Sequence, residues 1–126
     1  MIGGNLTLLA DSLGTTTEVD TVGKILIIEE VDEYRYKLDR MLTHLKRAHK
    51  LDSLAGLIIG HMTDIHDTEV SFGQTVEEII LEKVKDLTYP IAFHFPVGHK
   101  APNLAWRHGA VGTLTVSSEG SELLFE

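Results

Sequence analysis

The sequence contains no cysteine among its 126 residues. Disulfide bonds, thiolate nucleophiles and cysteine-bound zinc are therefore excluded, and the lack of cysteine fits a cytoplasmic protein. No apolar stretch approaches the ~20 residues that a membrane-spanning helix requires, and the N-terminus lacks the basic region and apolar core of a signal peptide. We therefore expect a cytoplasmic location and no membrane partner.

Positive charge is also scarce: the chain has 11 Lys and Arg residues but 19 Asp and Glu residues, which gives a net charge of −8. A nucleic-acid surface would need a basic stripe, so we expect no nucleic-acid partner. A chain of this length buries about two thirds of its unfolded surface, so residues 1–126 are expected to form a single domain. The chain opens on Gly3 and Gly4, a pair that usually connects two elements. We interpret this start as that of a domain excised from a longer protein.

Short apolar runs alternate with amphipathic stretches, which predicts an α/β fold. Strand–helix–strand units imply a parallel sheet with right-handed crossovers, and a terminal hairpin adds antiparallel strands. The expected helices are Leu6–Leu13, Glu33–His49 and Thr75–Lys85; the expected strands are Ile25–Glu30, Leu54–Gly60 and Ile91–Phe95, followed by a hairpin of Ala110–Val116 and Glu122–Phe125. Residues 61–73 and 98–108 are expected to be loops.

Polar residues close two of the apolar runs. Glu29 and Glu30 end one run, and His99 follows another through a Gly-containing turn. In neighbouring parallel strands these side chains would emerge at the carboxyl edge, where α/β sheets bind ligands. Side chains alternate along a strand, so at most one of the two glutamates can serve a single site. A carboxylate that orients an imidazole is two thirds of a hydrolase triad; the alternative is a strand end and a loop histidine that simply face solvent.

The nucleophile that would complete a triad is missing, because no serine lies in a G-x-S-x-G elbow. The segment His61–Asp67 holds two histidines and two aspartates, but its spacing matches no zinc motif, so we interpret it as a polar loop without metal. His94 lies inside an apolar run and is expected to be a buried structural histidine. His44 and His49 lie on a charged helix and are expected to be solvated.

Five segments in order resemble the C-terminal domain of the LD-carboxypeptidase family, which includes the microcin C immunity peptidases. They are Gly3–Leu9, Gly23–Glu30, Tyr36–Leu42, Leu54–Gly60 and Phe95–His99. Each motif alone is weak, but their order over the chain makes the match specific. The resemblance implies a swivelling β/β/α domain, with a parallel central sheet, helices and an antiparallel layer.

The resemblance also implies a Ser–His–Glu triad. Its serine belongs to an N-terminal domain that this chain lacks, while its glutamate and histidine match Glu29 and His99. From their position in the loop after His99, and not from the resemblance, Asn103 and Trp106 are expected to line the substrate cleft. The isolated domain is therefore expected to be inactive as a peptidase and to act with its own N-terminal catalytic-serine domain. The resemblance requires no metal or other cofactor and is compatible with a homodimer.

The substrate that the resemblance implies is a murein tetrapeptide, which is cut at the L,D-peptide bond to the terminal D-alanine. A second branch of the family cleaves a peptide–nucleotide antibiotic, so a microcin C-type immunity peptidase is an alternative. A non-catalytic interaction module is the competing class of function. A preceding segment that carries a serine elbow would decide for the peptidase.

Overall fold

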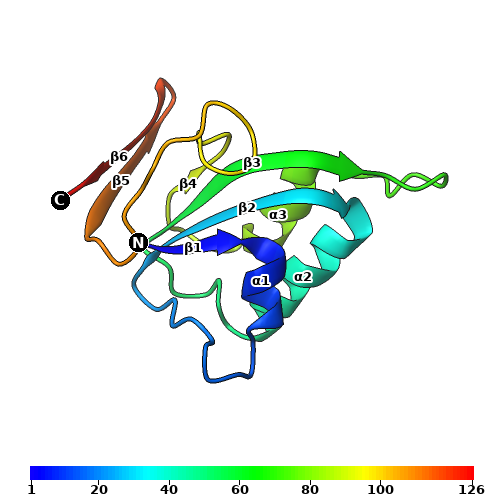
Figure 1. The fold of residues 1–126 in the computed structure, drawn as a ribbon, viewed down its shortest axis with the longest axis horizontal. Coiled ribbons are helices and arrows are strands. Elements are labelled where there is room, and N and C mark those ends of the chain that lie inside the picture. Colours follow the sequence, from blue (N-terminus) through cyan, green and yellow to red (C-terminus); the bar gives the residue numbers. More distant parts are fainter.

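The computed structural model describes all residues, 1–126, and its central feature is a four-stranded parallel sheet (Figure 1). Its strands are β1 (Ile2–Asn5), β2 (Ile25–Tyr34), β3 (Gly56–His66) and β4 (Ile91–Ala92), and they lie in the order β1-β2-β3-β4. Every neighbouring pair is parallel. The α/β class and the parallel sheet that the sequence predicts are confirmed.

The remaining elements are three helices and a hairpin. The helices are α1 (Leu6–Asp11), α2 (Arg35–Arg47) and α3 (Val76–Val84), and β5 (Gly112–Ser117) pairs antiparallel with β6 (Gly120–Phe125). The helices lie together beside the sheet, while the hairpin stands apart from them near the chain termini (Figure 1). The expected terminal hairpin is therefore confirmed. No helix has the length and apolar character needed to cross a bilayer.

Alternation along β2 produces two separate cores. Leu26 and Ile28 belong to a cluster of 15 buried residues that also includes the apolar faces of the three helices. Ile25 and Ile27 belong to a cluster of 6 buried residues, against which Trp106 and residues of the hairpin pack. The sheet thus has a helix face and a hairpin face, and consecutive strand residues point to opposite ones.

Side-chain caps define where two of the helices begin. The Asn5 side chain accepts a hydrogen bond of 3.2 Å from the Leu8 N–H at the start of α1. Thr75 and Glu78 form a capping box at the start of α3, in which each side chain accepts from the backbone N–H of the other. Asn and Thr suit these positions, because their side chains satisfy N–H groups that lack partners inside the helix.

The N-terminal glycine pair belongs to a strand, so its interpretation as a connecting turn is wrong. Gly3 lies opposite Ile27 in the ladder between β1 and β2. Its φ is +129°, and a Cβ at this position would lie 1.9 Å from the Ile27 carbonyl oxygen. Glycine is needed here for close backbone approach rather than for a turn.

Both central strands are longer than the sequence predicts, and residues 61–66 are strand rather than loop. The register pairs Glu33 with Ile65 and Tyr34 with His66. These outer residues alternate between intermediate and exposed positions, so backbone ladder bonds rather than apolar burial extend the strands. β4 is shorter than expected and ends at Ala92, and the backbone at His94 has a φ of +57°, which is incompatible with an extended strand.

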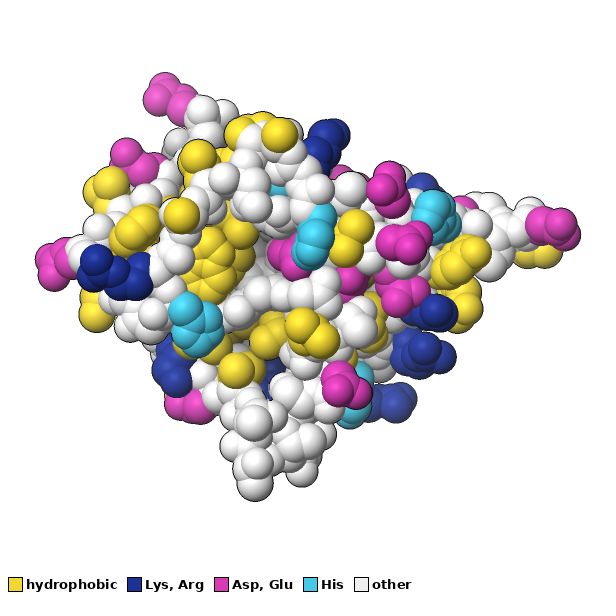
Figure 2. All heavy atoms as spheres, viewed as in Figure 1, with side chains coloured by type: hydrophobic (Ala, Val, Ile, Leu, Met, Phe, Trp, Pro, Cys, Tyr) yellow, Lys and Arg dark blue, Asp and Glu magenta, His cyan; other side chains and the backbone are white.

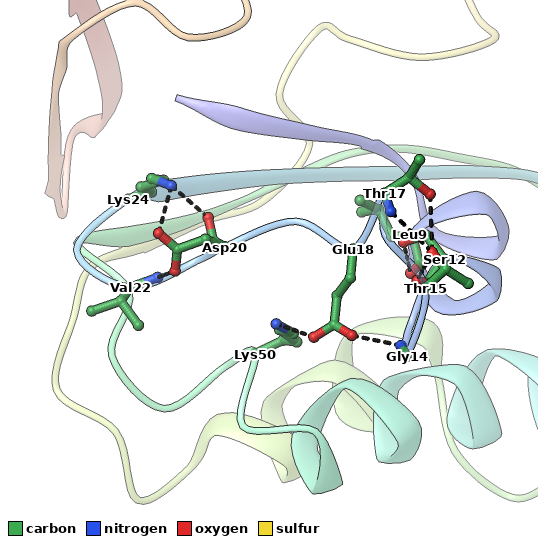
Figure 3. A network of polar contacts seen from close by, with 10 residues as sticks. All are labelled: Leu9, Ser12, Gly14, Thr15, Thr17, Glu18, Asp20, Val22, Lys24 and Lys50. Carbon is green, nitrogen blue, oxygen red and sulfur yellow. Dashed lines mark hydrogen bonds and ion pairs between the residues drawn. The ribbon is translucent and has the colours of Figure 1, made fainter.

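The segment between α1 and β2 is held by polar contacts rather than by secondary structure (Figure 3). Glu18 lies at the centre of this segment. One of its carboxylate oxygens accepts a 2.5 Å hydrogen bond from the Gly14 N–H, and the other pairs with the Lys50 ammonium group. The Lys50 side chain and the Gly14 N–H lower the pKa of Glu18 from its ordinary value of 4.5.

A lowered carboxyl pKa stabilises the fold only while the group is charged. The contribution of Glu18 is therefore present above its unfolded pKa and is lost as the pH falls through its folded pKa. We expect Glu18→Gln to destabilise the chain at pH 7 and to have a much smaller effect near pH 3. Urea unfolding at both pH values measures this, with the exposed Asp11→Asn as control. An equal loss at both pH values would contradict the prediction.

Candidate active site

Glu29 and His99 form a hydrogen-bonded pair. Glu29 lies in the middle of β2, opposite the last residue of β1, and His99 lies in the loop after β4. The distance from His99 Nδ1 to Glu29 Oε2 is 2.7 Å, although the two residues are 70 positions apart in sequence. The Glu29 side chain is 8% exposed and the His99 side chain is 53% exposed. A buried carboxylate thus holds one edge of an imidazole that is about half exposed to solvent.

Glu30 points to the opposite face and makes no contact with His99. Its Oε1 accepts from Asn5 Nδ2 at 2.7 Å and from the Val31 N–H at 2.9 Å. Its Oε2 accepts from the Thr7 N–H at 2.8 Å and the Thr7 hydroxyl at 2.7 Å. The two adjacent glutamates therefore separate into one that binds an imidazole and one that fastens the start of α1 to the sheet, which confirms the expected difference in orientation.

A tight loop carries His99 to the buried carboxylate. The Leu104 N–H donates to the Pro96 carbonyl at 2.8 Å, and the Gly98 N–H donates to the Asn103 side-chain oxygen at 3.2 Å. Gly98 has a φ of +133°, and a Cβ at this position would lie 3.1 Å from Glu29 Oε2. Only glycine allows the loop to pass this close to the carboxylate without strain.

The pair opens into a hollow of about 370 Å³, and the four residues singled out in the sequence all line it. Asn103 and Trp106 complete the wall, so the structure brings the expected cleft residues together with Glu29 and His99. Figure 2 views the molecule from the same side as Figure 1 and shows hydrophobic side chains gathered toward the hairpin, with charged and histidine side chains toward the ends of β2 and β3. The full lining is Gly4, Ile27, Glu29, Val97, Gly98, His99, Asn103 and Trp106.

The geometry determines which imidazole nitrogen is available for chemistry. An ionised carboxylate can only accept hydrogen bonds, so the contact with Glu29 keeps the proton on His99 Nδ1. The lone pair of neutral His99 then lies on Nε2, which makes no hydrogen bond within the chain. No serine lines the hollow or contacts the imidazole. The arrangement can therefore accept a proton at His99 Nε2 while Glu29 orients the ring, and no serine of this chain lies beside it.

The other histidines differ in part from expectation. His94 is not buried, because its side chain is 79% exposed and it lies beyond the end of β4. The left-handed backbone at this residue turns it out of the apolar run that suggested burial. His44 and His49 are exposed as expected, and His49 contacts Asp52 at 2.7 Å.

A larger cavity, of about 700 Å³, lies on the helix face of the sheet, and neither Glu29 nor His99 lines it. Its apolar lining residues, which include Ile59 and Phe93, belong to the helix-side core or pack against it. Arg35, Asp64 and Glu77 are among its charged lining residues. The structure has no group of three or more His, Asp or Glu side chains arranged to hold a metal ion.

Sequence reasoning missed His61. It was placed in a loop, whereas it belongs to β3 and hydrogen-bonds to the loop that carries His99. The strand pattern predicted only the apolar half of β3, and a polar residue beyond that half has no periodic signal. The pairing of β2 with β3 shifts register beside His61, between Ile28 and Glu30 of β2. Such a shift is a property of how the strands pair, which only the structure shows.

Comparison with known proteins places these features in a family. The family model described as "LD-carboxypeptidase C-terminal domain" matches residues 1–114. The chain is 33% identical over 119 residues to a probable murein peptide carboxypeptidase of Bacillus subtilis, covering 94% of this chain and 37% of that protein. It is 36% identical over 124 residues to the murein tetrapeptide carboxypeptidase of Pseudomonas aeruginosa, covering 98% and 38% respectively. The chain thus spans less than two fifths of the length of these relatives.

Solved structures agree on the fold. A muramoyltetrapeptide carboxypeptidase from Oxalobacter formigenes superposes with a TM-score of 0.83 at 28% identity, over 95% of this chain and 41% of that one. The microcin C7 self immunity protein MccF superposes with a TM-score of 0.81 at 22% identity, over 99% of this chain and 37% of that one, a likeness of fold alone. By the match of residues 1–114 and the identity to its relatives, the chain belongs to the LD-carboxypeptidase family and corresponds to its C-terminal domain.

Proposed function

We propose that this chain supplies the glutamate and histidine of a Ser–His–Glu triad within a longer serine carboxypeptidase. The observation that carries the proposal is the 2.7 Å contact between the buried Glu29 carboxylate and Nδ1 of the half-exposed His99. This arrangement orients an imidazole and leaves Nε2 open toward the hollow, as a general base requires. The serine would come from the part of the protein that precedes this domain.

In the proposed mechanism, His99 Nε2 takes the proton from the serine hydroxyl as the oxygen attacks the peptide carbonyl. The same nitrogen then returns the proton to the leaving amine. Glu29 keeps the proton of the neutral ring on Nδ1 and stabilises the imidazolium that forms between these two steps. Asn103 and Trp106 lie beside the dyad and contact the substrate in this proposal.

The substrate that we propose is a murein tetrapeptide, with hydrolysis of the L,D-peptide bond to the terminal D-alanine. The support is that relatives named as murein peptide carboxypeptidases share 33% and 36% of their aligned residues with this chain. The likeness to the microcin C7 self immunity protein, at 22% identity, concerns the fold and gives no comparable support for an antibiotic substrate.

The test compares this chain with the longer protein that contains it. We expect the longer protein to release D-alanine from murein tetrapeptide. The isolated chain should release none, because removing the nucleophile of a triad lowers turnover by roughly a millionfold. The control is a preparation made by the same purification from host cells that do not express the protein, and D-alanine release is measured in both. Activity of the isolated chain would contradict the two-part active site, and inactivity of the longer protein would favour a non-catalytic interaction module.

A further inference from the structure

An irregularity in the central sheet lies directly beside the dyad. Ile28 pairs with Ile59, but Glu30 pairs with Met62, so β3 contains one more residue than β2 across this interval. Two residues of β3, Gly60 and His61, thus lie opposite a single residue of β2, Glu29. This is the arrangement of a β-bulge. Bulges locally re-aim side chains and release backbone groups from the ladder. Here the released His61 N–H donates to the Val97 carbonyl at 2.7 Å instead.

The bulge directs the His61 side chain to the loop that holds His99. Its Nε2 lies 2.8 Å from the Pro102 carbonyl oxygen, which accepts no other hydrogen bond in the chain. A Cβ on Gly98 would lie 3.1 Å from the Cβ of His61 and equally 3.1 Å from Glu29 Oε2. Gly98 is therefore packed between the Glu29 carboxylate on one side and His61 on the other, immediately before His99.

We propose that His61 is a positioning residue that holds the segment 97–102 so that the His99 ring meets Glu29. It acts at two points, through its backbone N–H at Val97 and through its imidazole at Pro102, and these points flank His99. His99 is half exposed, so packing alone does not immobilise it. The functional consequence rests on the proposed triad, but the positioning itself is a property of this domain.

The proposal makes the two histidines opposite tautomers. A carbonyl oxygen can only accept, so the proton of neutral His61 must lie on Nε2, whereas that of neutral His99 lies on Nδ1. The imidazolium form of His61 also carries a proton on Nε2, so the bond to Pro102 persists whether His61 is charged or neutral. Nitrogen-15 NMR of the ring nitrogens distinguishes the two tautomers directly in this chain. Finding His61 protonated on Nδ1 alone would overturn the proposal.

The decisive experiment measures the His99 ring in His61 variants of this chain. In His61→Ala we expect the preference of His99 for the Nδ1–H form to fall roughly tenfold, because an anchoring hydrogen bond is lost. His61→Gln places an amide N–H near the former Nε2 and should restore that preference. His66→Ala is the matched control, since His66 lies on the same strand and contacts Asp32 instead. An unchanged His99 signature in His61→Ala, or the same loss in His61→Gln, would overturn the proposal.

A second readout applies to the longer protein and separates this proposal from the proposed function. We expect His61→Ala to lower kcat roughly 10- to 100-fold with KM unchanged, because misplacement of the base by a fraction of an ångström weakens proton transfer. His61→Gln should recover most of the loss. An unchanged kcat in an active enzyme would overturn the role of His61, whereas absence of all activity in the wild type would overturn the triad and leave the NMR result to decide the positioning.

Discussion

Replacing His99 by alanine in the longer protein is expected to lower turnover of murein tetrapeptide roughly 10⁴- to 10⁶-fold. The serine would then have no group to accept its proton, and Glu29 would be left without the ring that it orients. The fold should persist, because the His99 side chain is 53% exposed and its removal opens no core cavity. Steady-state kinetics and the melting temperature of the same preparation measure both effects.

His94→Ala is the matched control, since it changes a histidine five positions away in the chain. Its side chain is 79% exposed and lies 3.8 Å from Glu77, a contact too long and too exposed to stabilise the fold appreciably. We therefore expect turnover and melting temperature close to those of the wild type. If His94→Ala were the inactive and stable variant, the general base would have been assigned to the wrong histidine.

The two residues of the dyad could be predicted from the sequence because each follows an apolar run and each matches the family pattern. A run of apolar residues that ends in Glu29 and Glu30 and a run that leads to His99 both indicate strands of one parallel sheet. The expectation that these strands are neighbours is wrong, because β3 lies between β2 and β4, and β2 continues beyond Glu29 to Tyr34. The choice of Glu29 over Glu30 followed from alternation together with the family pattern. Alternation shows that only one of the two glutamates can serve the site, the family pattern selects Glu29, and the structure places its carboxylate 2.7 Å from His99 Nδ1.

The support around the dyad could not be predicted in the same way. His61 reaches the loop through a bulge, and a bulge depends on how two strands pair rather than on the composition of either. The polar half of β3 has no apolar alternation that predicts a strand, because its residues pair with β2 through the backbone ladder and only Met62 among them packs against the core. The apolar run predicts a buried His94, whereas the structure exposes its side chain, because the left-handed backbone at this residue interrupts the extended conformation of the run.

Glu30→Ala is expected to have the largest effect on stability of the substitutions considered. The Glu30 residue is 2% exposed, and its carboxylate accepts four hydrogen bonds from Asn5, Thr7 and Val31. Truncation removes the shared acceptor of all four donors, and the Glu30 side chain that is lost is buried although Thr7 is exposed. We expect the free energy of unfolding to fall by about 3 to 5 kcal/mol, with a drop in melting temperature of more than about 10 °C.

Glu29→Gln provides the contrast, because it replaces the adjacent carboxylate on the other face by a group of the same shape. Its side-chain oxygen can still accept from His99 Nδ1, so the free energy of unfolding should change by less than about 1 kcal/mol. Turnover in the longer protein should nevertheless fall roughly a thousandfold or more, since a neutral amide neither stabilises the imidazolium nor enforces the tautomer. Chemical unfolding of both variants and kinetics of Glu29→Gln test whether Glu30 serves stability and Glu29 serves turnover. A stable Glu30→Ala, or a fully active Glu29→Gln, would show that the roles of the two neighbouring glutamates are not separated by the face on which each lies.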